Sequence, residues 1–564
     1  MQSNCIREAS KACFNTCCLN PLLSLPAELH TSGPTKSTAA DVIDPRRDFV
    51  SAILSSIQPN ATFTNHESLP PSTELFANLK NAVPHYLNTV LADHIRAQEY
   101  HHLSNQARLD YIGHGLFSDS QKHESPFFDI SYSSTSLSSY LLHGGQESEF
   151  QSKTRKRIAR YMNVFEEDYS LVFTANQTSA FKILADSYPF RSDRNLLTVY
   201  DYENEAVQAM VESATRRGAR AQSAIFTWPG FKVNSRKLRK IVINKSRPKN
   251  RGLFAFPLQS RMTGSRYSYQ WMNLARDNGW HVLLDASALG AKDMETLGLS
   301  LFQPDFLICS FFKIFGENPS GFCCLFIKKS KISDLSQSDT SMGIISITPT
   351  TEKAENAENQ TTPFSSSTSQ QQEKATTSEI VELDENPIEC RALDHADKLG
   401  LILISSRLRC LINWLVNALL TLRHPHSGTG LQLVRIYGPR IKLDRGPALA
   451  FNVYDWKGER VDPVLVQKLA DRNNISLSTG FLRNIWFSDN FQEDKDRVLE
   501  NNASVKKKGK QDLGVFVVSV SLGMLSNFED MYRVWGFVSR FLDADFVEKE
   551  RWRYTALNQT TVEL

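Results

Sequence analysis

The sequence has 564 residues, of which 41% are hydrophobic and 22% charged, with a formal net charge of +3. This length suits a large core and more than one domain, and the near-neutral charge excludes the strong field typical of nucleic-acid-binding proteins. The sequence has no apolar run of about 18 residues and no secretory signal, so we expect a cytoplasmic protein without nucleic-acid or membrane partners.

The cysteines form two groups in the sequence. Four lie near the start, and they lack a second pair at zinc-ligand spacing, so we expect no metal centre. The other five are spread along the chain, several of them in apolar, strand-like runs where buried, reduced thiols are typical. The nine cysteines are Cys5, Cys13, Cys17, Cys18, Cys309, Cys323, Cys324, Cys390 and Cys410.

The N-terminal part combines a polar segment with a helical one. Residues 1–72 are rich in Ser, Thr, Pro and Asn, and we expect them to be mostly disordered apart from a short helix near 48–57. Apolar residues recur at helical spacing over 73–99. Residues 108–113 resemble a strand that enters a glycine turn.

Residues 73–332 are predicted to form a large α/β domain. Short apolar strands alternate with amphipathic helices, which favours a largely parallel sheet with its ligand beyond the carboxyl ends of the strands. The predicted strands are 170–174, 195–200, 252–256, 281–285, 306–311 and 321–327, and the predicted helices are 147–162, 178–187, 205–217 and 268–278.

Two further segments follow the large domain. Residues 333–386 are dominated by Ser, Thr, Gln and Glu, and this composition predicts a disordered insertion. Residues 387–564 are predicted to form a long helix and a smaller α/β domain. The long helix is expected at 393–422, strands at 448–453 and 514–519, and further helices at 463–472 and 527–542.

Two hydrophobic strands of the large domain are followed by charged residues. The strand 281–285 ends in Asp285, and Lys313 follows the strand 306–311. A charge at the end of a buried strand is unfavourable unless it has a partner or a function. Pyridoxal phosphate requires such a pair, because a lysine binds its aldehyde and a carboxylate keeps its ring nitrogen protonated. A simple Asp–Lys ion pair would explain the same pattern.

The residues around Lys313 resemble a known cofactor-binding motif. The segment 310–316, followed by Pro-Ser-Gly at 319–321, is similar to the Schiff-base motif of the molybdenum cofactor sulfurases, in the superfamily of class V aminotransferases and cysteine desulfurases. The similarity covers roughly residues 90–330 and 390–545 and is greatest to plant members. Three further segments resemble the family in the same order, 109–111, 172–180 and 254–260.

The resemblance implies a fold, a cofactor and an assembly. It implies the type I fold of pyridoxal-phosphate-dependent transferases, with a mostly parallel, seven-stranded sheet in the large domain and a smaller C-terminal α/β domain. It also implies pyridoxal 5'-phosphate, an amino-acid substrate and a homodimer.

The resemblance also assigns roles to individual residues. Gln177 and Thr178 lie in the family's phosphate-binding turn, although Thr178 could equally be an ordinary helix cap. Ser310 would add a hydroxyl to the phosphate, and Asn204 takes the place of a histidine that stacks on the cofactor ring. Arg445 could hold a substrate carboxylate, and a surface or interface salt bridge is the other interpretation.

The sequence departs from the family where sulfur is handled. Residues 481–483, Phe-Leu-Arg, stand where the family has a cysteine-containing tripeptide, and no cysteine follows Cys410. A persulfide relay needs a thiolate. Asn204 cannot act as a general base near neutral pH. Arg261 replaces an asparagine that contacts the ring hydroxyl, Ala288 replaces a glutamine, and the family's extra C-terminal domain has no counterpart.

Three hypotheses follow for the function. The first is a pyridoxal-phosphate-dependent transferase or lyase that acts on an amino acid. The second is a cofactor-binding or scaffold protein that has lost catalysis. The third is a sulfurase whose cysteine comes from elsewhere, such as Cys390 or the N-terminal group.

Overall fold

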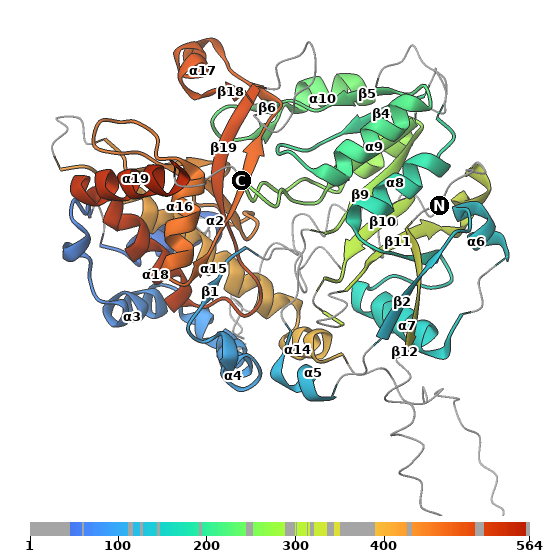
Figure 1. Ribbon diagram of the computed structural model, residues 1–564, viewed down its shortest axis with the longest axis horizontal. Helices are drawn as coiled ribbons and strands as arrows, with labels where there is room; N and C mark the ends of the chain where they lie inside the picture. The colour runs from blue at the N-terminus through green and yellow to red at the C-terminus, as the bar shows by residue number, and fades with distance from the viewer. Residues whose placement is uncertain are drawn as a thin grey trace, which may run out of the picture.

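A computed structural model describes most of the chain, which forms a large sheet with surrounding helices and a smaller C-terminal sheet (Figure 1). The described residues are 45–58, 61–110, 117–124, 128–143, 147–190, 194–243, 252–287, 299, 302–312, 314–315, 321–335, 343–349, 390–425, 431–501 and 513–559.

The larger sheet contains β2 (Phe128–Ser133), β3 (Tyr169–Thr174), β4 (Asn195–Thr198), β5 (Arg220–Ser223), β8 (Gly252–Pro257), β9 (Trp280–Asp285), β10 (Phe306–Ser310), β11 (Cys323–Lys328) and β12 (Ile344–Pro349). Their order is β2-β12-β3-β11-β10-β9-β8-β4-β5. Strands β10, β9, β8, β4 and β5 are parallel, and β11 is antiparallel to both neighbours. The seven strands from β3 to β5 in this order match the predicted seven-stranded sheet, and strands β12 and β2 extend this sheet beyond β3.

Helices cover this sheet and bury its central strands. Strand β8 is buried along its whole length, and β9 and β10 nearly so, which explains why they appear in the sequence as continuous apolar runs. Helices α8 and α9 pack against each other, α8 on β3, β10 and β11 and α9 on β4 and β5. The helices are α6 (Leu137–His143), α7 (Glu149–Met162), α8 (Gln177–Ser187), α9 (Glu205–Arg216), α10 (Ser235–Val242) and α11 (Gln270–Asp277).

Strand β12 corrects one prediction. It lies inside the segment 333–386, for which the sequence predicted disorder, and the prediction was wrong for residues 343–349. The three isoleucines of β12 are fully buried, and the strand pairs with β2 over six residues. Short apolar stretches like this one can order themselves inside a polar segment when a sheet edge is available. Residues 350–386 lie outside the described residues.

The C-terminal part contains a smaller antiparallel sheet and its helices. The sheet has the order β13-β14-β19-β16, and β18 (Glu500–Asn501) pairs with β19. The other elements are α14 (Arg391–Leu399), α15 (Leu401–Leu420), β13 (Val434–Tyr437), β14 (Ala448–Val453), α16 (Pro463–Arg472), β15 (Ile475–Ser476), β16 (Ser478–Leu482), β17 (Ile485–Trp486), α17 (Gln492–Val498), β19 (Leu513–Ser521), α18 (Phe528–Ser539) and α19 (Ala544–Gln559).

The predicted long helix is divided into α14 and α15. Gly400, at φ 76°, separates the two helices because this backbone conformation cannot continue an α-helix. By length and composition alone, α15 is the one helix among the described residues that could cross a membrane. However, 78% of its most apolar stretch is buried inside the structure, as in the core helix of a globular protein.

The N-terminal helices pack on the C-terminal part of the chain. Helices α2, α3 and α4 and the 3-10 helix η3 lie beside α14, α15 and α18, and β1 pairs with β15. The short helix predicted near 48–57 is therefore present as α2. These N-terminal elements are α2 (Pro45–Ser55), α3 (Ser72–Ala82), η3 (Pro84–Thr89), α4 (Val90–Glu99) and β1 (Ala107–Arg108).

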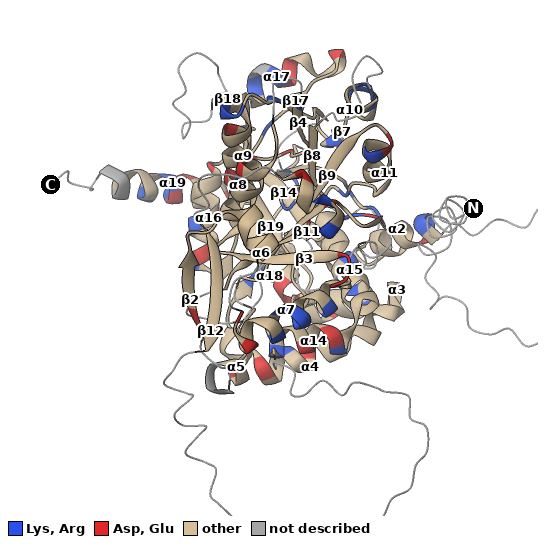
Figure 2. Cartoon of the chain, turned by 90° about the vertical axis from the view of Figure 1, so that its right-hand side faces the viewer, with Lys and Arg blue, Asp and Glu red and all other residues tan. Residues whose placement is uncertain are grey.

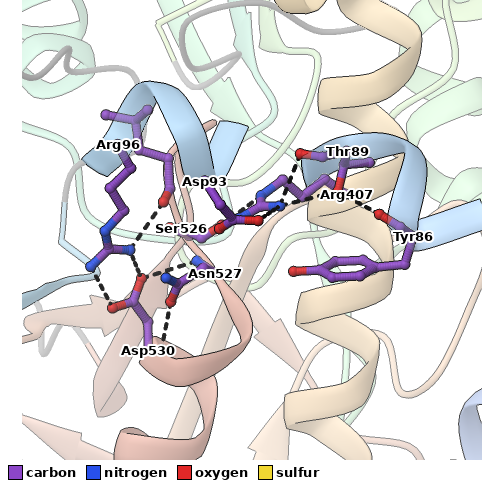
Figure 3. A network of polar contacts seen from close by, with 9 residues as sticks. Tyr86, Thr89, Asp93, Arg96, Arg407, Ser526, Asn527 and Asp530 are labelled. Atoms are coloured by element: carbon purple, nitrogen blue, oxygen red, sulfur yellow. Dashed lines mark hydrogen bonds and ion pairs between the residues drawn. The ribbon is translucent and has the colours of Figure 1, made fainter. Parts of the chain in front are cut away.

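Two arginines hold this N-terminal segment in place (Figure 3). Arg407 of α15, only 1% exposed, forms an ion pair with Asp93 of α4 at 2.6 Å and donates to the carbonyl oxygen of Ser526 at 2.8 Å. Arg96 of α4 forms a forked ion pair with Asp530 of α18. Because both guanidinium groups are paired and hydrogen-bonded, their burial is compensated.

Charged residues of both signs are mixed over the surface (Figure 2). Helices α7 and α14 lie side by side there, and Arg157 of α7 donates to Asp394 and Asp397 of α14 at 2.8 and 2.9 Å. This mixture agrees with the small net charge and with the absence of a single-sign field across the described surface.

Candidate functional site

The predicted site residues meet at the carboxyl ends of the parallel strands. In the strand registers, Thr174 lies opposite Cys323, which lies opposite Ser310, so these residues form one row across β3, β11 and β10. Asp285 ends β9, next to Ile308 of β10. Helix α8 begins just beyond this row, three residues after Thr174.

Asp285 is a buried acid at this edge, with 3% of its surface exposed. Its carboxylate accepts hydrogen bonds from the backbone N–H of Ser287 at 2.9 Å, the hydroxyl of Tyr200 at 3.1 Å and the side-chain amide of Gln177 at 3.2 Å. Burial raises the pKa of Asp285, while hydrogen bonds from Ser287 and Tyr200 and the charge of Arg261 act in the opposite direction. In the described part of the chain no cationic nitrogen lies within ion-pair distance of this carboxylate.

The first turn of α8 supplies donors for an anion. Asn176 caps the helix, because its side-chain oxygen accepts from the backbone N–H of Ser179 at 2.8 Å. Thr178 is therefore not the capping residue, and its half-buried hydroxyl lies in the first turn. Gln177 extends from the same turn to Asp285, so the helix N-terminus and the carboxylate are one side chain apart.

The position of Lys313 lies outside the described residues. Ser310, which ends β10 three residues before it, is half-buried at the same edge as Asp285. The structure thus brings Gln177, Thr178, Asp285 and Ser310 together, and the role of Lys313 stays a prediction.

Asn204 is the N-cap of helix α9. Its side-chain oxygen accepts from the backbone N–H groups of Ala206 at 2.9 Å and Val207 at 3.4 Å. Its amide nitrogen donates to the hydroxyl of Tyr202 at 3.3 Å. Both ends of the amide are therefore engaged within the protein, and the predicted contact with a cofactor ring stays a prediction.

Arg445 is buried against backbone carbonyl groups. Its guanidinium donates to the carbonyl oxygens of Ala448, at 2.7 Å, and Pro439. Burial lowers the pKa of Arg445 to about 9. No carboxylate of the described residues lies within ion-pair distance of it, and its predicted contact with a substrate carboxylate stays a prediction. Its visible role is to hold the loop before β14.

Sequence reasoning missed the polar group formed by Asp201, Ser260 and Thr263. Asp201 is fully buried and accepts hydrogen bonds from the hydroxyls of Ser260 at 2.7 Å and Thr263 at 2.6 Å. Burial raises the pKa of Asp201 to about 6, and the two hydroxyls act in the opposite direction. The available signal was an acid after the apolar strand β4, the same pattern that identified Asp285.

The segment that departs from the sulfur-handling motif is fixed on the large domain. The backbone N–H of Glu203 donates to the carbonyl oxygen of Phe481 at 2.8 Å, and that of Arg483 donates to the carbonyl oxygen of Asp201 at 2.9 Å. Phe481 and Leu482 are buried at the end of β16. The tripeptide therefore forms part of the domain contact and supplies no thiol.

A cavity among the described residues lies away from this edge. Its volume is about 340 Å³, and Tyr169, Ser170 and Leu171 at the beginning of β3 line it, at the opposite edge of the sheet from Asp285. Its charged residues Glu147 and Arg155 already form an ion pair at 2.7 Å. We therefore place the candidate site at the carboxyl edge, where the buried acid lies.

Comparison with known proteins gives a consistent relationship. No family model matches the sequence. Molybdenum cofactor sulfurase from Bos taurus is 25% identical over 510 residues, covering 84% of this chain and 54% of the relative. The enzyme from Homo sapiens is 28% identical over 420 residues, covering 68% of this chain and 43% of the relative. The chain spans about half the length of the curated relatives that it matches.

Solved structures show a weaker likeness. An apo cysteine desulfurase from Thermococcus onnurineus NA1 is 16% identical with a TM-score of 0.48, covering 81% of this chain and 98% of that chain. A cysteine desulfurase from Escherichia coli is 15% identical with the same TM-score, covering 80% and 98%. The strand order confirms the predicted α/β class, with a large sheet and a smaller C-terminal sheet. Over most of its own length, this chain resembles the molybdenum cofactor sulfurases of animals, plants and fungi.

Proposed function

We propose that this chain binds pyridoxal phosphate and acts on an amino acid as a transferase or lyase. The observation that carries the proposal is the environment of Asp285. This buried carboxylate has three hydrogen-bond donors but no described cation, so a protonated ring nitrogen would supply the charge that it lacks. The sequence similarity to molybdenum cofactor sulfurases supports the same cofactor.

The described residues fit this cofactor. A phosphate dianion suits the N-terminus of α8, where the Thr178 hydroxyl and free backbone N–H groups of the first turn would bind it. Ser310 would add a second hydroxyl from the neighbouring strand row. Gln177 reaches from this turn to Asp285. The phosphate would therefore bind at one end of the site and the ring nitrogen at the other.

Each residue would then have a defined task. Lys313 would hold the cofactor through its amine, and Asp285 would keep the ring nitrogen protonated. Tyr200 orients Asp285 through its hydroxyl. When bound, pyridoxal phosphate supplies an electron sink for bond breaking at the amino-acid α-carbon. We do not propose Arg445 as a substrate-binding residue, because its guanidinium donates to two backbone carbonyl oxygens.

The environment of the thiols argues against sulfur transfer. The tripeptide 481–483 contains no cysteine, and Cys390 is buried, which raises its pKa to about 12. Burial also raises the pKa of Cys410 to about 12. Nucleophilic attack requires a thiolate, and these side chains are neither ionised near neutral pH nor accessible. The four N-terminal cysteines lie outside the described residues.

Cofactor binding can be tested on the purified full chain. Pyridoxal phosphate is added, the visible absorbance is recorded, and the protein is reduced with borohydride and analysed by peptide mass spectrometry. We expect the label on the peptide that contains Lys313, and no label in Lys313→Ala. A colourless protein, or a label on another lysine, would contradict the proposal.

Turnover is tested with a panel of amino acids on the same two proteins. We expect the wild-type chain to convert at least one amino acid and Lys313→Ala to convert none. Equal rates for the two proteins would exclude catalysis through Lys313.

A cofactor-binding protein without turnover is the second candidate. It is favoured by Asn204, which stands in the place of the family's histidine and whose amide is engaged in the cap of α9. This position therefore supplies no general base. Labelling of Lys313 without conversion of any amino acid would identify this second function.

We also propose a homodimer in the cytoplasm, as the resemblance implies. Light scattering of the purified chain measures the assembly, and imaging of a tagged chain in cells measures the location. A monomer at micromolar concentration would contradict the first statement.

A further inference from the structure

Arg261 lies on a tight turn that begins close to the end of β9. The turn follows β8, whose next residue, Leu258, donates its backbone N–H to the carbonyl oxygen of Asp285 at 3.4 Å. Within the turn, the backbone N–H of Gly264 donates to the carbonyl oxygen of Ser260 at 3.1 Å. Arg261 directly follows Ser260, so its backbone is held at the carboxyl edge of the sheet.

The buried acid Asp201 holds this turn in place through two hydrogen bonds. Its carboxylate accepts from the hydroxyls of Ser260 at 2.7 Å and Thr263 at 2.6 Å, the residues on either side of Arg261 along the turn. Asp201 thus orients the turn and forms no ion pair with Arg261 in the described structure. The two hydroxyl donors offset part of the cost of burying this carboxylate and fix the turn to it.

The small domain fixes the same turn from the other side. The backbone N–H of Gly446 donates to the carbonyl oxygen of Gly264 at 2.9 Å. A side chain at Gly480 would place its Cβ 2.4 Å from Cε of Met262, so these two residues touch. The turn that carries Arg261 is therefore clamped between the two domains, next to the candidate site.

The positive charge of Arg261 influences the pKa of nearby site residues, and no carboxylate of the described residues pairs with it. Burial raises the pKa of both Asp285 and Tyr202, and the charge of Arg261 acts against this rise at each of them. The side chain is half-buried, and none of the described carboxylates lies within ion-pair distance of it. A partly desolvated arginine without a carboxylate partner favours an anionic ligand, which its planar fork can bind with two hydrogen bonds.

We propose that Arg261 binds an anionic oxygen of the ligand in this site and thereby selects amino acids with a second carboxylate. This inference rests on the proposed function and names its substrate class. The same chemistry has a second possible source, the ring oxygen of the cofactor. In the first case Arg261 is a specificity-determining residue and in the second a cofactor-binding one, and in both Asp201 is a positioning residue that acts through the turn.

Two pairs of compounds that differ by one negative charge test the proposal. The first pair is L-aspartate and L-asparagine, titrated into the cofactor-loaded full chain and followed by the cofactor absorbance. The second pair is pyridoxal phosphate and its 3-O-methyl ether, titrated into the cofactor-free chain. Wild type, Arg261→Lys and Arg261→Gln are compared with the control Arg220→Gln, which removes the same charge from the exposed edge strand β5.

The expected result is a loss of charge preference in Arg261→Gln alone. We expect wild type and Arg220→Gln to bind L-aspartate about tenfold more tightly than L-asparagine, and Arg261→Gln to bind both alike. Arg261→Lys should keep part of the preference, because it keeps the charge and loses the fork. If the preference lies in the cofactor pair instead, the anionic oxygen belongs to the cofactor, and Arg261 still binds it.

The outcomes that overturn the proposal are separable from those that overturn the proposed function. Cofactor uptake with equal discrimination in wild type and Arg261→Gln, for both pairs, would overturn the assignment of Arg261 alone. Failure of the wild-type chain to take up the cofactor would overturn both proposals. Unfolding midpoints of all variants are measured first, so that a misfolded variant is replaced by Arg261→Met.

Discussion

The side-chain amide of Gln177 donates to both oxygens of Asp285, at 3.4 and 3.2 Å. Gln177 begins helix α8 and Asp285 ends strand β9, so this contact joins the anion-binding end of the candidate site to its acidic end. A neutral amide is a weaker donor to a carboxylate than a cationic ring nitrogen. We therefore expect a bound cofactor to displace this amide from Asp285.

Replacement of Asp285 by asparagine should weaken cofactor binding by about tenfold or more. The amide has nearly the same shape but no charge, so it cannot hold a protonated ring nitrogen. The measurement is a titration of the cofactor-free chain with pyridoxal phosphate. Asp334→Asn is the control, because its carboxylate is 43% exposed and far from the carboxyl edge. Equal affinities for the two variants would remove Asp285 from the site.

The titration of Asp201 should appear in the stability of the protein. Its pKa is raised to about 6 in the folded state and is about 3.9 in the unfolded chain. Between these values the unfolded chain releases its proton first, so the free energy of unfolding falls as the pH rises. The raised pKa contributes about 2–3 kcal/mol to the free energy of unfolding below about pH 4, and this contribution is lost as the pH rises through about 6.

The variant Asp201→Asn isolates this effect because it cannot ionise. Urea unfolding of both proteins is measured from about pH 4 to about pH 7. The variant should gain stability relative to wild type as the pH rises through this window. A constant difference between the two curves would show that the carboxyl of Asp201 keeps its ordinary pKa.

Replacement of Arg407 by methionine should destabilise the protein by about 2–4 kcal/mol. The change removes a fully buried guanidinium that donates to the carbonyl oxygen of Ser526 and pairs with the half-exposed carboxylate of Asp93. Urea unfolding measures the loss. In Arg46→Met, the control, the ion pair with Asp444 is 3.7 Å long and Arg46 is 58% exposed, so its loss should be below about 0.5 kcal/mol. Similar losses in both variants would contradict a structural role for Arg407.

Replacement of Gly264 by alanine should disturb the contact between the two domains. Gly264 has φ 70°, and a Cβ there would lie 2.3 Å from the carbonyl oxygen of Ala448. Gly458→Ala is the matched control, since it has φ 79° and no atom within 4 Å of its Cβ. The control measures backbone strain alone, about 1–2 kcal/mol, and Gly264→Ala should cost at least about 1 kcal/mol more. Thermal unfolding that is equal in both would exclude the steric effect.

The sequence by itself determined the sheet and one edge of the site. Apolar runs such as 281–285 and 306–310 are buried on both faces, so their pattern predicts strands without knowledge of their neighbours. Because parallel strands end at one edge, Asp285 and Lys313 were also predicted to lie together, whereas Ser310 was assigned to the site by the family resemblance. Strand β12 was not predicted, because it lies in a low-complexity segment and is ordered by its pairing with β2 and β3.

Only the tertiary structure decided the contacts between residues far apart in the chain. Asp201 receives the hydroxyls of Ser260 and Thr263, about 60 residues away, and neither segment carries a local signal for the other. Arg445 donates to backbone carbonyls, which no residue pattern encodes. Local propensity and hydrophobic periodicity act over a few residues, whereas the partner of a buried polar group depends on how whole elements pack.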